Sequence, residues 1–498
     1  MKFAFFTYDG HGLPIAFKLH QEGYDVIVGQ AENLEHMPKE NEILKERRLK
    51  LYDGLIEKVS ADKLLELLRK ENPEDWFVIA DFNYVFPYTE KLAKLGFKGL
   101  LPTKEDFEFE ENREKAKDLV LRRYPIFSQL EVYEFESVNN AIQFLQENQD
   151  KIFGVKGFNP EAPTYFPASN NPKIAHEELI DILQQEKKLY ESEGFILEEK
   201  VEDLLEFVPE IITFDGEIVG MSVDVEAKYF GAGDIGPQTG CSADIVFWID
   251  KNDPAFQKLY ELFFEPIEEI IFRENQMVIW DAGVIYSPSR DKFFFTECSS
   301  LREGYNSVFT KLSTLDKVSD YYFSIMNKQF IYQGGFGTSI RIFNELEDEK
   351  NKGFSMGNIK IIANLQNKDI WLWDVYLKNS KILNVGYDRN LAVITTKTNN
   401  WKEGFRKIDE FLSKGEEFIF PAMYFKRYWD LIQTDYPNNF VNRMQFLEKF
   451  LNKKLERKFV SDFESLTEFV QKLEEEEEEE EDTTKQIRED LLRFLDEI

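Results

Sequence analysis

Long apolar runs, cysteines and an excess of basic residues are all missing from this sequence. No apolar stretch approaches the roughly 18 residues that a transmembrane helix needs, so we expect no membrane span. Cysteine occurs only as Cys241 and Cys298, too few for a disulfide framework, which indicates a reducing compartment. Asp and Glu number 93 against 61 Lys and Arg, which excludes general attraction to nucleic acid. We therefore expect a cytoplasmic protein that contacts phosphate only in a local pocket.

The 498 residues are 43% hydrophobic, which is enough for packed cores and predicts roughly two to four domains. The acidic tract from Glu474 to Asp482 carries part of the net charge of −32. A solvated charged segment explains this tract, and a partner-binding element is the alternative.

Strand-like and helix-like patterns alternate over residues 1–105. The segment "KFAFFTY" predicts a first strand rather than a leader, "IAFKLHQEG" a helix and "DVIVG" a second strand, and Ser60 is a candidate N-cap. This alternation is typical of a doubly wound parallel sheet, which binds ligands at the carboxyl ends of its strands. Gly10, His11 and Gly12 directly follow the first strand and are candidate substrate contacts; a tight turn would explain the two glycines equally.

The rest of the chain predicts an α+β body. We expect residues 106–200 and 201–330 to form two lobes, residues 331–430 a small α+β subdomain, and residues 431–498 a helical acidic extension. The segments "FDGE" and "SPSRD" separate apolar runs and predict hairpin turns.

Two acidic residues interrupt neighbouring apolar strands. The segments "IWDAGVIY" and "FFFTECS", joined by the turn "SPSRD", place Asp281 and Glu297 in adjacent antiparallel strands. A carboxylate in an apolar run is costly unless a cation meets it, and Mg²⁺ prefers carboxylate oxygen ligands. The pair is therefore a candidate metal site, with ordinary salt bridging as the alternative.

Five segments occur in an order that resembles the ATP-grasp superfamily, whose two lobes hold ATP and activate a carboxylate as an acyl phosphate. They are Arg113 at a helix start, Lys156 in a strand, "EEKVEDLLE" at 198–206, Lys228 in "EAKY", and the pair Asp281 and Glu297.

The resemblance implies a role for each position. Glu198, Glu199 and Lys200 would form the hinge whose backbone meets adenine, and Glu206 would accept the ribose hydroxyls. The phosphates would be bound by Lys156, Arg113 and Lys228, the last near the γ-phosphate. Considered separately, the segment at 198–206 could equally be a solvated acidic linker, and each of the three cations could be an ordinary surface charge.

Within the superfamily, the sequence resembles phosphoribosylamine–glycine ligases (glycinamide ribonucleotide synthetases) over residues 1–430. The segment "AKYFGAGDIGPQTGC" is similar to their Gly-Asp-x-Gly-Pro-x-Thr-Gly stretch, which implies that Lys228 is catalytic and that the acceptor pocket contains Asp234, Gly236, Pro237, Thr239 and Gly240. The implied substrates are ATP with Mg²⁺ (or Mn²⁺), glycine and the amine phosphoribosylamine, without nucleic acid or membrane, in a monomer or homodimer.

Departures from the family pattern lie mainly on the acceptor side. The Gly-rich phosphate loop is replaced by "GFNPEAPTYFPASN", which predicts a loop that is stiffer or serves a bulkier substrate, and "GHGLP" lacks the family's arginine. Arg302 is retained as a candidate catalytic residue, and Ser299 stands where the family has an asparagine metal ligand. We therefore expect an ATP-grasp carboxylate–amine ligase, in which the amine is phosphoribosylamine or another amine such as a modified nucleotide. A non-catalytic nucleotide-binding assembly protein, and a thiol role for the cysteines, are the alternatives.

Overall fold

The computed structural model describes residues 1–455 except 38, 112–121, 125, 159–161, 163, 168, 237, 301–305, 352–353 and 435. For residues 110, 111, 238 and 296–300 the backbone alone is described. Residues 1–455 form one compact unit. Within this described part, no helix combines the length and the apolar character that crossing a bilayer would require.

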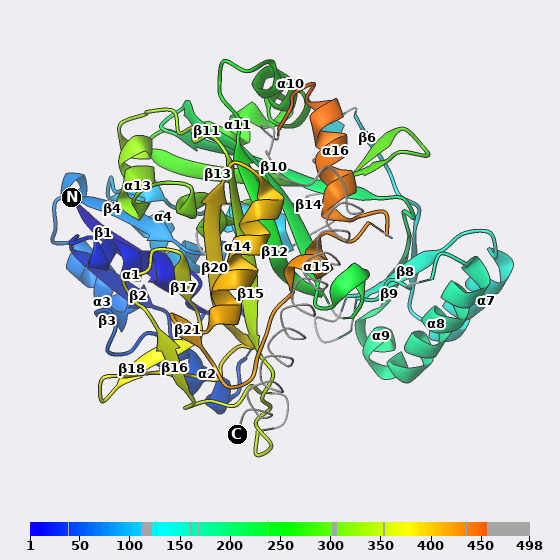
Figure 1. Cartoon of the computed structure of the whole chain (residues 1–498), viewed down its shortest axis with the longest axis horizontal. Helices are drawn as coiled ribbons and strands as arrows, with labels where there is room; N and C mark the ends of the chain where they lie inside the picture. The colour runs from blue at the N-terminus through cyan, green and yellow to red at the C-terminus, as the bar shows by residue number, and fades with distance from the viewer. Residues whose placement is uncertain are drawn as a thin grey trace, which may run out of the picture. The chain divides into compact units, whose positions relative to one another are not determined.

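The N-terminal part is built on parallel strands, as the alternating pattern predicts (Figure 1). Strand β1 pairs with β2 on one side and β4 on the other, and Phe3 and Phe5 are buried within it. Ser60 caps α3 by accepting from the Lys63 N–H, which confirms that prediction. The elements are β1 (Lys2–Thr7), α1 (Leu13–Gln21), β2 (Val26–Gln30), α2 (Glu42–Lys50), β3 (Lys58–Ser60), α3 (Ala61–Leu68), η1 (Pro73–Asp75), β4 (Trp76–Ala80), η2 (Asn83–Val85), α4 (Phe86–Lys94), β5 (Lys98–Leu100) and α5 (Lys104–Glu111).

The first lobe is a three-stranded antiparallel sheet in the order β7-β9-β8. Its own apolar cluster includes Leu145, Phe153, Leu179 and Phe195 and joins the sheet to its helices. The elements from residue 127 onward are β6 (Phe127–Ser128), β7 (Val132–Phe135), α7 (Val138–Glu147), β8 (Phe153–Gly157), α8 (Pro172–Gln185), α9 (Lys187–Glu193) and β9 (Phe195–Glu199).

The second lobe continues the N-terminal sheet. Strand β13 pairs in parallel with β5, so a single sheet runs through β15-β12-β11-β10-β13-β5-β4-β1-β2. Asp215 and Gly216 both have positive φ in the β10–β11 turn, which confirms the "FDGE" hairpin. The elements are β10 (Leu205–Phe214), β11 (Glu217–Tyr229), η3 (Ala232–Asp234), β12 (Gln238–Trp248), α10 (Pro254–Phe263), η4 (Glu265–Ile267), α11 (Glu268–Ile271), β13 (Gln276–Ser287), β14 (Lys292–Ser300), α12 (Asn306–Ser313), α13 (Val318–Met326) and β15 (Phe336–Asn344).

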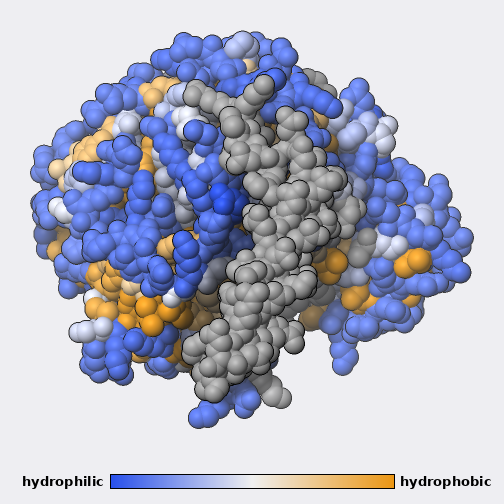
Figure 2. Space-filling model, viewed as in Figure 1, coloured by the Kyte–Doolittle hydropathy of each residue, from blue (hydrophilic) through white to orange (hydrophobic). Residues whose placement is uncertain are grey.

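The last described part adds strands to the large sheet and packs helices beside it. Strand β20 pairs with β15, and a separate sheet has the order β18-β19-β16-β21. Figure 2 shows a largely hydrophilic face with an apolar area over this small sheet. The elements are β16 (Lys360–Ala363), β17 (Ile370–Leu372), β18 (Val375–Lys378), β19 (Lys381–Asn384), β20 (Asn390–Thr398), α14 (Trp401–Lys414), β21 (Phe418–Ile419), β22 (Met423–Tyr424), α15 (Tyr428–Leu431) and α16 (Phe440–Phe450). The fold is thus mixed α/β and α+β, as predicted.

Candidate functional site

The first-lobe lysine meets an acidic partner on the neighbouring strand. Lys156 of β8 and Glu198 of β9 form an ion pair, with 2.6 Å between Nζ and Oε1. The two strands are antiparallel neighbours, with Gly154 opposite Glu198. Nζ also lies 5.4 Å from the centre of the Phe166 ring. Because the pair is partly exposed, a phosphate group could replace the carboxylate as the lysine's partner.

The loop after β8 is docked onto that strand. Tyr165 and Val155 exchange two backbone hydrogen bonds of 2.8 and 2.9 Å. Phe166 fills the space beside Gly154, where a Cβ would lie 2.3 Å from the ring. The Lys200 ammonium group donates to the Pro167 carbonyl at 2.6 Å and to Asn170 Oδ1 at 2.9 Å. These contacts support the stiffer loop that its prolines and aromatics predict.

The hinge positions use their backbone N–H groups within the protein. The Glu199 N–H donates to the Glu131 carbonyl at 2.9 Å, and the Lys200 N–H donates to the Ile152 carbonyl at 2.8 Å. The Glu199 carboxylate pairs with Arg290 at 2.9 Å. Adenine bound at this hinge would therefore have to form hydrogen bonds with backbone groups other than these two N–H groups.

In the second lobe, Glu206 and Lys228 form the counterpart of the first-lobe pair. The distance from Lys228 Nζ to Glu206 Oε1 is 2.6 Å, and both side chains are partly exposed. The Lys228 carbonyl accepts a hydrogen bond of 2.9 Å from the Thr239 hydroxyl. The predicted ribose and γ-phosphate residues therefore lie together at one end of strands β10 and β11.

A row of buried acids follows on the same sheet. Glu210 is 3% exposed and forms an ion pair with Lys311 of α12, which is 1% exposed. Asp224 and Asp244 are also buried, and burial raises the pKa of both carboxyl groups well above the usual range, whereas Lys311 opposes that rise. The buried ammonium group of Lys311 thus interacts with the carboxyl groups of Glu210, Asp224 and Asp244.

Asp281 lies where this acidic row meets β14. The register places it opposite Glu210 on one side and opposite Ser299 on the other. Directly opposed residues of antiparallel strands point to the same face, so Asp281 shares the face of the acidic row. Glu297, two residues before Ser299, lies in β14, and its side chain is outside the described part, as is that of Ser299. Among the described residues, no group of three or more His, Cys, Asp or Glu side chains could hold a metal ion, so a Mg²⁺ site at Asp281 and Glu297 stays a prediction.

The glycine-rich loop between β11 and β12 adopts left-handed backbone conformations. Asp234 has φ 56°, Gly236 has φ 88° and Gly240 has φ 78°. Burial raises the pKa of Asp234, and the neighbouring Arg443 and Lys426 oppose that rise. The Thr239 carbonyl accepts a hydrogen bond of 2.8 Å from Arg341. Cations from later parts of the chain thus lie beside Asp234 and Thr239, whereas Ile235 of the same loop is 65% exposed.

The N-terminal loop brings His11 next to aromatic and acidic side chains. The His11 ring lies between Phe82 and Trp373, with ring centres 5.4 and 5.0 Å away. Its Nδ1 is 3.5 Å from Asp9 Oδ1. Gly12 N–H donates to Asp81 at 2.8 Å, and burial, with Asp9 nearby, raises the pKa of Asp81 well above its usual range. The Arg341 guanidinium lies 5.7 Å from the Trp373 ring, which connects this loop to β15.

Some predicted positions are not covered by the structure. Arg113, Pro237 and Arg302 lie outside the described residues. Cys241 is buried, and its pKa is raised by burial and by the acids Glu226 and Asp244. Since the thiolate is the reactive form, this environment disfavours a nucleophilic thiol.

Sequence reasoning missed the cations that the later segments bring to the site. They are Lys311, Arg341, Lys426 and Arg443, each no more than 3% exposed. Two of them could have been identified from the sequence, because Lys311 interrupts the apolar run "NSVFTKLS" and Arg341 interrupts "FGTSIRIFN". A buried cation must find a partner, but the pattern does not identify it.

Comparisons with known proteins bear on the fold. No family model matches the sequence, and no curated protein sequence matches it. Phosphoribosylamine–glycine ligase from Thermotoga maritima has a similar structure, with TM-score 0.58 and 13% identity over 86% of this chain and 100% of that chain.

Two further solved structures are similar over most of the chain. Biotin carboxylase from Campylobacter jejuni has TM-score 0.53 and 11% identity, covering 85% of this chain and 92% of that chain. The biotin carboxylase domain of 2-oxoglutarate carboxylase from Hydrogenobacter thermophilus, solved with MgADP and bicarbonate, has TM-score 0.54 and 11% identity, covering 92% and 99%. The chain therefore has the ATP-grasp fold, which confirms the resemblance at the level of the fold.

Proposed function

We propose that the protein is an ATP-dependent ligase that joins a carboxylate to an amine through an acyl phosphate. The observation that carries this proposal is the pair of lysine–glutamate contacts in the two lobes, Lys156–Glu198 and Lys228–Glu206. Asp281 lies on β13, the strand that pairs with the one bearing Glu206. Partly exposed lysines held by carboxylates are poised to exchange those partners for phosphate oxygens. The similar fold of a phosphoribosylamine–glycine ligase supports the same reaction class.

In the proposed reaction, a substrate carboxylate oxygen attacks the γ-phosphorus of ATP, and ADP leaves. The amine nitrogen then attacks the acyl carbon, the C–O bond to phosphate breaks, and the nitrogen loses a proton. Lys156 would bind the α- and β-phosphates and Lys228 the transferred phosphoryl group, where fixed positive charge stabilises the transition state. Asp281 and Glu297 would hold Mg²⁺, which neutralises the triphosphate.

The two substrates are proposed by class. Glycine with phosphoribosylamine is the first pair to test, because the fold and the glycine-rich loop are similar to those of that ligase. A different amine is the second, because the loop around His11 offers an aromatic environment in which Asp9 would attract an amine. The His11 imidazole is placed to accept the proton that the amine loses.

The test is phosphate release from ATP and Mg²⁺ with glycine and other amino acids, with and without a panel of amines. Turnover that requires both an amino acid and an amine is the expected result. The double substitution Asp281→Asn with Glu297→Gln should abolish it, whereas Asp291→Asn, an acid in the exposed turn of the same hairpin, should not. Undiminished turnover in the double variant, or no binding of MgADP to the wild-type protein, would refute the proposal.

A further inference from the structure

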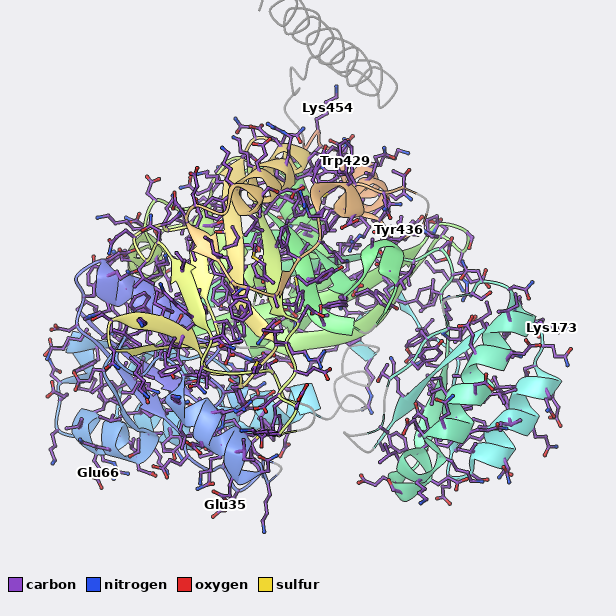
Figure 3. The ribbon with its side chains drawn as sticks, turned by 60° about the horizontal axis from the view of Figure 1, so that its bottom comes forward. Glu35, Glu66, Lys173, Trp429, Tyr436 and Lys454 are labelled. Carbon is purple, nitrogen blue, oxygen red and sulfur yellow. The ribbon has the colours of Figure 1, made fainter. Side chains whose placement is uncertain are left out.

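Two buried cations from the last described segments lie beside the glycine-rich loop. Lys426 follows β22 and is 3% exposed, and Arg443 lies in α16 and is 2% exposed. Each attracts Asp234, the acid at the end of η3. The Tyr424 hydroxyl, two residues before Lys426, donates to the Phe230 carbonyl at the start of the loop, at 3.3 Å. The segment that contains Tyr436 connects α15 to α16, and Tyr436 Cδ1 is 4.0 Å from the position of a Cβ at Gly233 (Figure 3). The loop and the two cations therefore form one neighbourhood.

Arg443 is anchored to the two strands that carry Glu206 and Lys228. Its Nη1 donates to the Glu206 carbonyl at 3.3 Å and to the Glu226 carbonyl at 2.7 Å. Its Nε is buried and has no hydrogen-bond partner among the residues that the structure describes. A buried N–H of a charged group that lacks an acceptor costs free energy, and a ligand oxygen at this place would remove that cost.

Neither cation has an acidic partner at salt-bridge distance among residues 1–455 as far as these are described. This is unexpected in a chain of net charge −32, where carboxylates are abundant. Burial lowers the pKa of Lys426 to about 8, and Arg443 adds to that effect. The charged and titratable neighbours that act on Lys426 are Asp234, Arg443, Cys241 and Asp430.

We propose that Lys426 and Arg443, together with the loop at residues 231–236, form a subsite that binds a carboxylate group of a substrate. This inference deepens the proposed function and rests on it for the identity of the molecule as a substrate. Asp234 acts on both cations, and Glu206 and Glu226 also act on Arg443. These acids would repel a phosphate dianion more strongly than a monoanionic carboxylate. The subsite lies next to Lys228, so the bound molecule would lie beside the transferred phosphoryl group.

The test uses simple anions on the full chain. Acetate and inorganic phosphate are titrated separately at constant ionic strength, with chloride as the background ion, and the shift of the thermal unfolding midpoint gives an apparent Kd. Acetate should stabilise the wild-type protein more than phosphate does at equal concentration. Lys426→Met should weaken acetate binding about tenfold or more, the loss expected for one charge-assisted hydrogen bond. Lys426→Arg should retain most of the binding.

Controls keep the result interpretable. Lys454→Met removes the same charge from an exposed position and should leave the acetate Kd unchanged. Lys426→Met should fold, because methionine has a similar length and removes a buried charge. Equal acetate protection in wild type and Lys426→Met would overturn the subsite, and stabilisation by phosphate alone would overturn the assignment to a carboxylate. MgADP binding is measured in the same assay, and its absence would refute the proposed function without altering the acetate result.

Discussion

Breaking the buried ion pair between Lys311 and Glu210 should destabilise the protein strongly. Lys311 lies in α12 and Glu210 in β10, and the two residues are 101 positions apart in the chain. The side chains are 1% and 3% exposed. The substitution Lys311→Met keeps the volume and removes the ammonium group, so Glu210 must remain as an unpaired buried anion or take up a proton.

The expected loss is about 3–5 kcal/mol of unfolding free energy, the cost of leaving one partner of a buried pair without the other. Glu210→Gln should cost less, because Lys311 then still attracts Asp224 and Asp244. Substituting both residues together should recover part of the loss, because the charge of Glu210 is then removed, although Asp224 and Asp244 still lack the ammonium group.

The pH dependence has a definite sign. Burial already raises the pKa of Asp224 and Asp244 in the folded protein, and Lys311 opposes the rise. Without Lys311 these pKa values rise further. A carboxyl group whose pKa is higher in the folded than in the unfolded protein makes the folded state less stable as the pH increases. The deficit of Lys311→Met relative to wild type should therefore grow as the pH rises above the ordinary pKa range of carboxyl groups.

The assay is urea unfolding followed by tryptophan fluorescence, since Trp248 and Trp280 lie in the strands of this sheet. Lys454→Met, at an exposed position, is the control and should change the stability by less than about 0.5 kcal/mol. A loss below about 1 kcal/mol for Lys311→Met, or a double variant no more stable than the single one, would refute the reasoning.

Three further outcomes are expected. Lys228→Met should lower kcat for phosphate release by about a hundredfold or more while changing the Kd for MgADP little, because the lysine would act on the transferred group; an unchanged kcat would contradict this role. Acetate should bind with full affinity below pH 8 and more weakly above it, because burial lowers the pKa of Lys426 to about 8 and only the charged form attracts the anion. A pH-independent Kd of the wild-type protein for acetate would contradict this prediction. Lys200→Met removes the donor to Pro167 and Asn170, so limited proteolysis should cut the loop after β8 faster than in wild type, and equal rates would show that this anchor is dispensable.

The sequence alone determined the local features of this protein. Buried apolar runs such as β1 and the hairpin signal "FDGE" depend on neighbours within a few residues, and both are found as predicted. The order of five segments, from Arg113 to the pair Asp281 and Glu297, carried the resemblance to the ATP-grasp superfamily, which the fold confirms.

The tertiary structure alone decided which charges meet. Lys311 selects Glu210 across 101 positions, and Arg443 reaches the Glu206 carbonyl across 237. No periodicity encodes these contacts, because a lysine in an apolar helix satisfies the local pattern whichever acid it meets. The partner is fixed by the sheet order and by the helices that pack against it. The surroundings of the candidate site are therefore a product of chain topology, whereas its strands are a product of local sequence.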